Sequence, residues 1–280
     1  MLRVCDPNHL RVQTISTFSS IKDITSKEPF FSGSDIHLLN GDCTETNLFA
    51  NKFVDLIVTS PPYNVGMGYN SHNDMQGYEK YLEFSRQWMS NCYCWSKPSA
   101  RFLLNIPLDK NKGGHQSVGA DLTTIAKEAG WSYHSTIIWN EGNISRRTAW
   151  GSWLSASAPH IIAPVELVVV FYKGQWKKTS GSLKSTVTRD EFMRWTNGLW
   201  TFNGESAKRV GHPAPFPREL PRRCIRLFSF EGDVVFDPFC GSGTTLIEAQ
   251  ANGRFGVGVE IDRQYCDLAK GRILKAIQSN

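Results

Sequence analysis

Long apolar runs are absent from this chain. The longest, Leu167–Tyr172, has the length of a strand and is far too short to cross a membrane. The first 14 residues carry several charges and a proline, and they contain no apolar stretch of signal-peptide length. These absences favour a cytoplasmic protein that does not associate with a membrane.

Paired cysteine motifs are also absent. The seven cysteines are scattered from Cys5 to Cys266, and no two of them form a CxxC pair. Cys92 and Cys94 are separated by one residue and have no matching pair downstream. An odd, scattered set favours reduced thiols over a disulfide scaffold, and it lacks the ligand spacing of a zinc site. We therefore expect no bound metal.

An excess of positive over negative charge is absent from most of the chain and is found in one segment. The net charge of the chain is +5, and residues 173–209 alone hold eight Lys or Arg against three Asp or Glu. That segment therefore carries the whole excess of the chain. A basic insertion on a neutral body suits a polyanionic partner, and the alternative is an ordinary solvated surface.

Apolar residues make up 40% of the chain, enough for a sizeable core. Residues 1–35 are polar and resemble an arm. From Ile36 onward, short apolar runs alternate with amphipathic stretches, which predicts an α/β fold. The expected strands are Ile36–Leu39, Val54–Val58, Phe102–Ile106, Ser135–Trp139, Leu167–Tyr172, Val234–Phe236 and Phe255–Val259. The expected helices are Tyr78–Trp95, Val118–Ala129, Arg218–Phe228, Thr244–Ala251 and Arg263–Ile277.

A glycine-rich turn stands near the C-terminus, in the sequence VVFDPFCGSGTTLIEA. An apolar strand ends at Asp237, and Gly241 and Gly243 allow a tight turn into a helix whose N-terminus favours polar or anionic groups. Glu260 follows at the end of the next strand, where an acid can accept both ribose hydroxyls of a nucleoside. The motif lacks the third glycine of an NAD site. The alternative is a tight turn that binds nothing.

A second motif, DLIVTSPPYNVGMG, places Ser60, Pro61, Pro62 and Tyr63 directly after an apolar strand. The prolines fix an extended turn at the edge of the sheet where open α/β sheets bind ligands. The Ser60 hydroxyl and the Pro61 carbonyl are two hydrogen-bond acceptors, and Tyr63 offers an aromatic face. Methylation of a planar amino group needs such a set, because its delocalised lone pair must be localised and aligned. Alternatively, Tyr63 lies in the core.

Together, SPPY and DPFCGSGTT resemble the motifs of amino-methylating DNA methyltransferases. The order of the motifs resembles the β group, a circular permutation of the common fold, and the resemblance extends from about Leu38 to Ala276. It implies a Rossmann-like, S-adenosylmethionine-dependent methyltransferase fold with a basic target-recognition insertion. The implied divisions are an arm (1–35), a catalytic half (36–172), the insertion (173–210) and a cofactor-binding half (211–280).

The same resemblance assigns roles residue by residue. Asp42 resembles an acid that reaches the cofactor adenine or lies beside the target pocket. His212 and the residues after it resemble a segment that holds the methionine end of the cofactor. The cofactor-binding residues implied are Asp42, His212, Pro213, Phe216, Pro217, Asp237, Phe239, Gly241, Gly243, Thr244 and Glu260, and the catalytic residues are Ser60, Pro61, Pro62 and Tyr63.

The resemblance also implies DNA as the partner. The target base must be flipped out of a duplex unless the substrate is single-stranded. Residues 64–77 are expected to form a loop that closes over this base, or an ordinary surface loop. Trp150 and Trp153 either fill the vacated stack or pack in the interior. The expected DNA-binding residues are Arg146, Arg147, Lys177, Lys178 and Lys184.

Within this family, SPPY usually accompanies cytosine N4 methylation, whereas DPPY or NPPY accompanies adenine N6 methylation. The resemblance thus favours cytosine N4 in a short, specific sequence of the restriction-modification type. Adenine N6 is the nearest alternative. Methylation of RNA or a protein amide, and a non-enzymatic nucleic-acid-binding module, are more distant ones. A homodimer and a companion restriction endonuclease stay open.

Overall fold

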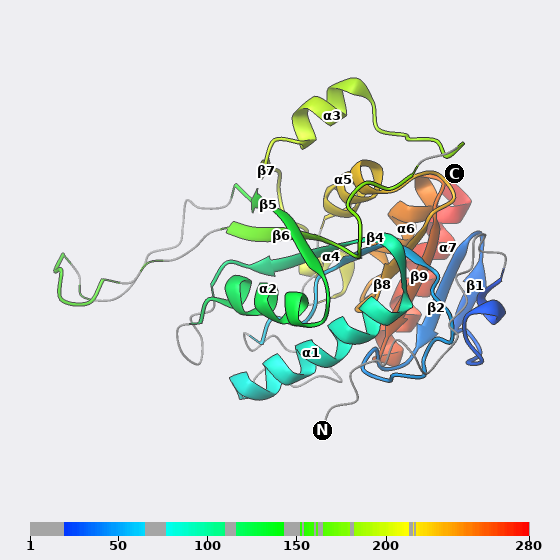
Figure 1. Ribbon diagram of the computed structural model, residues 1–280, viewed down its shortest axis with the longest axis horizontal. Helices are drawn as coiled ribbons and strands as arrows, with labels where there is room; N and C mark the ends of the chain where they lie inside the picture. The colour runs from blue at the N-terminus through cyan, green and yellow to red at the C-terminus, as the bar shows by residue number, and fades with distance from the viewer. Residues whose placement is uncertain are drawn as a thin grey trace.

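A nine-stranded sheet organises the chain in a computed structural model (Figure 1). The structure describes residues 20–64, 77–109, 116–142, 152, 154–159, 161, 165–179, 182–212, 215 and 217–279. The strand order is β1-β2-β9-β8-β3-β4-β6-β5-β7. The strands are β1 (Phe31–Gly33), β2 (Ile36–Asn40), β3 (Val54–Thr59), β4 (Ser96–Pro107), β5 (Ser132–Asn140), β6 (Val165–Tyr172), β7 (Leu199–Thr201), β8 (Val234–Asp237) and β9 (Phe255–Glu260).

Helices cover both faces of this sheet, giving three layers. The helices α1 and α2 pack against one face, and α5, α6 and α7 pack against the other (Figure 1). The helical elements are η1 (Ile21–Asp23), α1 (Tyr78–Trp95), α2 (Val118–Glu128), α3 (Arg189–Trp195), α4 (Ala207–Val210), α5 (Glu219–Phe228), α6 (Thr244–Ala251) and α7 (Arg263–Ser279).

Strand direction decides where ligand-binding groups can gather. The neighbouring strands β2, β9, β8, β3 and β4 are all parallel, so their carboxyl ends meet at one edge of the sheet, named here the carboxyl edge. The strand β6 is antiparallel to both β4 and β5, so β6 begins at this same edge. Open α/β sheets bind ligands at such an edge.

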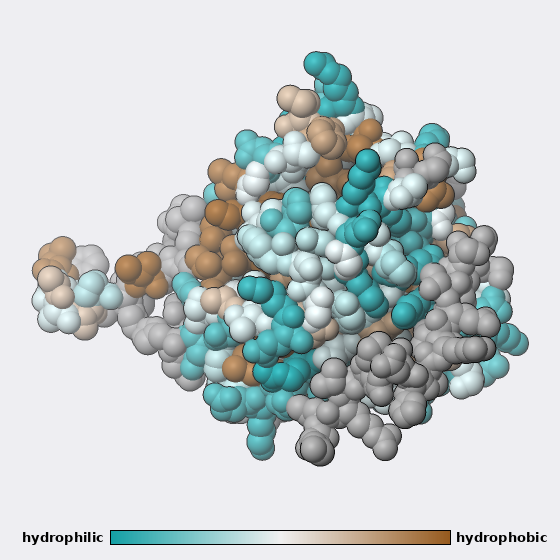
Figure 2. All heavy atoms as spheres, in the orientation of Figure 1, coloured by the Kyte–Doolittle hydropathy of each residue, from teal (hydrophilic) through white to brown (hydrophobic). Residues whose placement is uncertain are grey.

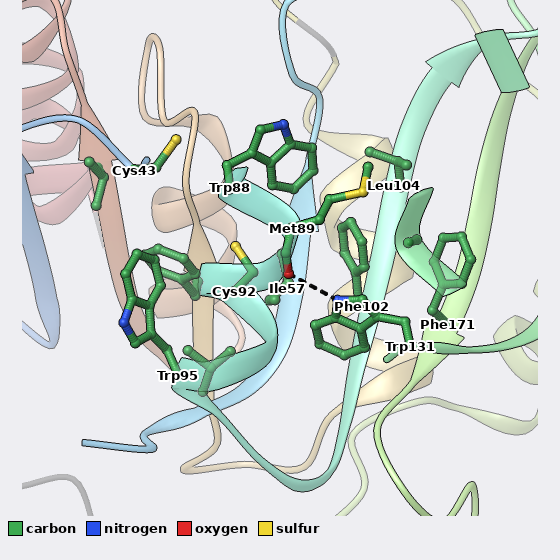
Figure 3. Packing of buried hydrophobic residues seen from close by; sticks show 14 of the residues in the cluster. Cys43, Ile57, Trp88, Met89, Cys92, Trp95, Phe102, Leu104, Trp131 and Phe171 are labelled. Carbon is green, nitrogen blue, oxygen red and sulfur yellow. Dashed lines mark hydrogen bonds between the residues drawn. The ribbon is translucent and has the colours of Figure 1, made fainter. Parts of the chain in front are cut away.

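Aromatic side chains fill the core between the sheet and α1. Trp88, Trp95, Phe102, Trp131 and Phe171 pack together there, and the Trp131 indole nitrogen donates a hydrogen bond of 3.2 Å to a backbone oxygen of α1 (Figure 3). Truncating one such ring to alanine typically costs roughly 3–5 kcal/mol. The aromatic residues Trp88 and Trp95 of α1 thus serve in packing.

The far end of the sheet is covered less fully than its centre. Ile138 of β5 and Leu199 of β7 are register partners, and both side chains are about half exposed. Figure 2 shows apolar side chains on the surface along this side of the molecule. Their exposure follows from position, because β7 is a short strand at the edge of the sheet.

Several elements differ from the sequence prediction. The strands β1 and β7 and the helices α3 and α4 were not expected. The strand β7 lies within residues 173–210 and pairs in parallel with β5, so the expected insertion is partly built into the sheet. No helix among the described residues is long and apolar enough to cross a membrane.

The cysteines agree with the expected reduced thiols at five positions and disagree at one. Among the described residues, Cys43, Cys92, Cys224, Cys240 and Cys266 are buried free thiols. Burial raises the pKa of these thiols, which makes them unreactive. Cys94 is disulfide-bonded, so the prediction is wrong there. Counts and spacings along a sequence do not report which cysteines lie close together in space. No cluster of potential metal ligands occurs in the described part of the chain.

Candidate active site

The glycine-rich turn connects β8 to α6 at the carboxyl edge. Gly241 and Gly243 have φ values of +51° and +80°, a left-handed conformation that favours glycine. A Cβ atom on Gly241 would lie 2.9 Å from the Nε2 atom of His212. The structure therefore brings His212 against the turn, and the close approach leaves no room for a side chain at Gly241.

Glu260 ends β9 beside this turn, and only 8% of its surface is exposed. Its Oε2 atom accepts a hydrogen bond of 2.8 Å from the Gly241 amide, and its Oε1 atom accepts one of 2.9 Å from the Asp262 amide. Burial raises the pKa of Glu260 despite these two bonds. A carboxylate offers about four lone-pair positions. Two hydroxyl groups can therefore still bind to it.

Asp237 is a buried acid whose carboxylate accepts hydrogen bonds from within the protein. It is 1% exposed, and it accepts hydrogen bonds of 2.7 Å from the hydroxyls of Thr59 and Thr245 and one of 3.1 Å from the Phe239 amide. Burial raises its pKa to about 6. These bonds tie the end of β3 to the end of β8 and the start of α6. Asp237 thus fixes the relative position of the two motifs.

Ser60 and Tyr63 follow β3, the neighbour of β8 in the sheet. The Ser60 Oγ and Tyr63 Oη atoms are 2.6 Å apart. Tyr63 donates a hydrogen bond of 3.1 Å to Glu166, and the Asn105 amide donates bonds of 2.8 Å to Tyr63 and 2.6 Å to Glu166. Tyr63 is half-buried and also packs against the core. Tyr63 therefore lies partly in the core, while its hydroxyl belongs to a hydrogen-bonded group with Ser60, Asn105 and Glu166.

Other predicted cofactor residues gather at the same edge. Asp42 follows β2, and its carboxylate accepts a 2.8 Å bond from the Thr44 amide in a local turn. Phe239 is half-buried, with its ring centroid 5.1 Å from that of Trp88. Pro217 and Thr244 are buried. Pro213, Phe216, Arg146 and Arg147, together with Trp150, Trp153 and most of the expected loop over residues 64–77, lie outside the described residues.

The model of a DNA methylase family, N6/N4 methylase, matches residues 54–271. The match begins at β3 and ends within α7, so it includes both motifs and the sheet that joins them. The chain belongs to the N6/N4 DNA methylase family.

The methylase is similar to several characterised proteins. Type II methyltransferase M.MjaVI of Methanocaldococcus jannaschii is 56% identical over 175 residues, which are 62% of this chain and 89% of that protein. Type II methyltransferase M.ScaI of Streptomyces caespitosus is 29% identical over 269 residues, which are 90% of this chain and 86% of that protein.

Solved structures support the fold. TTHA0409 of Thermus thermophilus, solved in complex with S-adenosyl-L-methionine, has a TM-score of 0.68 and 29% identity, covering 87% of this chain and 95% of that one. The cytosine-N4-specific PvuII DNA methyltransferase has a TM-score of 0.68 at 20% identity, covering 91% and 95%. The expected methyltransferase fold is therefore confirmed.

Three lysines of the methylase lie away from its motifs. The Lys178 ammonium lies between Asp55, at 3.0 Å, and Asp233, at 2.8 Å. Both acids stand where β3 and β8 begin, at the edge opposite the motifs. Lys184 pairs with Glu231, just before β8, and Lys177 is the exposed neighbour of Lys178. Lys178 is thus held in an ion-pair network, and all three lysines lie away from the motifs; their expected DNA-binding role stays a prediction.

Sequence reasoning did not identify Asn105 and Glu166 as part of this site. Both were visible as polar residues within apolar strands, in FLLNIP and VELVVVFY. A polar residue in such a strand needs a hydrogen-bonding partner or a function. Their connection to Tyr63 depends on the pairing of β4 with β6, which no local sequence pattern specifies.

Proposed function

We propose that this DNA methylase transfers a methyl group from S-adenosylmethionine to the exocyclic amino group of a flipped DNA base, with cytosine N4 as the target. The observation that carries the proposal is the 2.7 Å hydrogen bond from Thr59 to Asp237. It holds Ser60, which follows β3, beside the glycine-rich turn, which follows β8. An amino-group pocket and a nucleoside site then lie next to each other at one edge of the sheet.

The residues at the turn fit the cofactor. Glu260 has lone pairs for two ribose hydroxyls, Phe239 provides an aromatic wall, and the backbone turn at Gly241 and Gly243 admits close approach of a ligand. The N-terminus of α6 lies behind the turn and favours the carboxylate of the methionine end. When bound, the cofactor supplies the methyl group: its S–CH3 bond breaks as the N–CH3 bond forms, and S-adenosylhomocysteine leaves.

The residues after β3 prepare the amino nitrogen. Ser60 Oγ and the Pro61 carbonyl each accept one N–H of the base, which moves the amino group towards tetrahedral geometry and localises its lone pair. The Tyr63 ring holds the base so that nitrogen and methyl are aligned. The methylated nitrogen then loses its extra proton to solvent. No strong general base is needed before attack, because the product is far more acidic than the substrate.

The choice of base depends on Ser60. Serine at this position accompanies cytosine N4 methylation in the resemblance that the motifs carry, and adenine N6 remains the alternative because a hydroxyl can accept from either amino group. The Type II names of M.MjaVI and M.ScaI support a short recognition sequence and a companion restriction endonuclease. We expect DNA to bind at the carboxyl edge, where both motifs lie.

Mass spectrometry of nucleosides tests this function. Unmethylated double-stranded DNA is incubated with the protein and S-adenosylmethionine, with Tyr63→Ala as the matched control. N4-methylcytosine from the wild type, and a large loss of product from the variant at unchanged cofactor affinity, are expected. N6-methyladenine would keep the mechanism and overturn the choice of base. No methylated base on double- or single-stranded DNA would overturn the proposal.

A further inference from the structure

Three neighbouring strands place polar groups on one face of the sheet at its carboxyl edge. On β4, Asn105 lies two residues beyond the buried Leu103. On β6, which runs the other way, Glu166 lies two residues before the buried Val168. Because side chains alternate along a strand, each polar residue continues the apolar face that packs against α5. Ser60 likewise lies two residues beyond the buried Val58 of β3.

The hydrogen bonds among these groups have a defined direction. A carboxylate only accepts, and the Asn105 amide nitrogen only donates. Tyr63 therefore accepts from Asn105 and gives its single proton to Glu166. The 2.6 Å contact between Ser60 and Tyr63 must then be donated by Ser60.

This direction leaves Ser60 as an acceptor on its other side. With its proton committed to Tyr63, the lone pairs of Ser60 Oγ remain for a donor such as the amino group of a base. Linked hydrogen bonds polarise each other, so a carboxylate at the end of the chain makes the first oxygen a stronger acceptor. A serine is otherwise a weaker acceptor than an aspartate.

We propose that Glu166 and Asn105 are positioning residues for methyl transfer, and that Glu166 supplies through Tyr63 the negative charge that Ser60 itself lacks. Asn105 holds the Tyr63 hydroxyl and the Glu166 carboxylate together by donating to both. The inference rests on the proposed function, because it requires Ser60 to accept the amino group of the target base. Glu166 does not touch that base; it acts through two hydroxyl groups.

Glu166→Gln is the informative variant. A single oxygen of Glu166, Oε2, accepts from both Tyr63 and Asn105. The amide oxygen of glutamine can accept the same two bonds, so the substitution removes the charge and keeps these two hydrogen bonds. We expect the single-turnover rate of methyl transfer to fall about ten- to hundred-fold, as when one charge-assisted hydrogen bond becomes neutral. The KM for DNA, the affinity for S-adenosylmethionine and the melting temperature should stay at wild-type values.

The hydrogen bonds that link Glu166 through Tyr63 to Ser60 are named here the relay. Tyr63→Phe tests this relay at its middle residue. It removes the hydroxyl, keeps the ring, and should slow methyl transfer by a similar factor. Because both variants break one chain of hydrogen bonds, the double variant should be no more than about twofold slower than the slower single variant. Glu79→Gln is the matched control, since Glu79 is an exposed acid in the first turn of α1 and should react at the wild-type rate.

The possible outcomes distinguish failure of the relay from failure of the proposed function. An undiminished rate in Glu166→Gln, multiplied losses in the double variant, or a rate loss matched by weaker cofactor binding would overturn the relay while leaving the methyltransferase intact. Failure of the wild type to methylate DNA would remove the proposed function, and the relay with it.

Discussion

Asp237 is a buried carboxyl group whose ionisation opposes folding. Its pKa rises from 3.8 to about 6 because burial removes it from water, even though three hydrogen bonds favour its charged form. The native state therefore binds more protons than the unfolded state between about pH 4 and pH 6. Its contribution to stability is greatest below this window and is lost as the pH rises through it, by about 3 kcal/mol in total.

Asp237→Asn should flatten this dependence. Asparagine cannot ionise, so the free energy of unfolding should fall by about 2 kcal/mol less between pH 4 and pH 6 than in the wild type, which is the part of the total effect that falls inside this window. Urea unfolding at a series of pH values measures the difference. The exposed Asp267→Asn serves as control and should keep the wild-type slope. A slope unchanged by Asp237→Asn would show that the native carboxyl group does not titrate with a raised pKa between pH 4 and pH 6.

Glu260 is the second acid of the site, and its expected role is binding. Glu260→Ala removes the acceptor proposed for both ribose hydroxyls, and we expect the affinity for S-adenosylmethionine to fall at least about tenfold. Titration calorimetry measures the loss, and Glu79→Ala is the control. An affinity equal to that of the wild type would show that another residue binds the ribose. Because the Gly241 and Asp262 amides also lose their acceptor, melting curves should accompany the titration.

At the scale of elements, α3 begins with a complete capping box. The Thr188 hydroxyl accepts a bond from the Glu191 amide, while the Glu191 carboxylate accepts one from the Thr188 amide. Thr188→Ala removes half of this arrangement and should lower the free energy of unfolding by about 1 kcal/mol. Chemical denaturation tests it against Thr179→Ala, an exposed threonine before the helix. Equal stability of the two variants would show that tertiary contacts of α3, such as the buried Trp195 and the ion pair of Glu191 with Arg226, hold the helix without the cap.

The sequence predicts long, strongly patterned elements better than short ones. The bounds of α1 and α6 agree with the prediction residue for residue, because aromatic spacing in one and the glycine turn in the other define them. The strands β1 and β7 have three residues each and exist through pairing with β2 and β5. The Thr188–Glu191 capping box was a local signal for α3 that the prediction did not use.

The residues of the site also divide into those that the sequence could predict and those that it could not. Ser60, Tyr63 and the glycine-rich turn stand in contiguous motifs, so sequence alone could identify them. Asn105 and Glu166 join them only because β4 lies between β3 and β6 in the sheet. The basic composition of residues 173–210 suggested one DNA-facing surface. The fold instead uses Lys178 to neutralise two acids inside the protein.

At the scale of the whole molecule, the contribution of a lysine or arginine to DNA binding should depend on the edge of the sheet at which it lies. Lys208 and Arg209 belong to α4, between β7 and His212, and His212 packs against the turn at Gly241. Arg209 pairs with Glu205 but, unlike Lys178, stays exposed to solvent. Replacing both with alanine should reduce the slope of log K against log salt by about 0.9 for each phosphate that the protein no longer neutralises. Replacing Lys177 and Lys184 instead should leave the slope unchanged.

Fluorescence titration of a DNA duplex at several salt concentrations compares the two double variants. The two pairs are matched in charge removed, so net charge alone predicts equal effects. A flatter slope for the Lys177 and Lys184 pair would mean that DNA also contacts the edge opposite the motifs.

The bond between Thr59 and Asp237 also has a consequence for biosynthesis. Its two ends are 178 residues apart in the chain. At translation rates of ~5–20 residues per second, roughly 9–36 s separate the synthesis of these two residues. During that interval β3 has been made but β8, its neighbour in the finished sheet, has not. A nascent chain therefore carries a complete SPPY motif well before it can hold a cofactor, and the enzyme becomes active only when its last strands join the sheet.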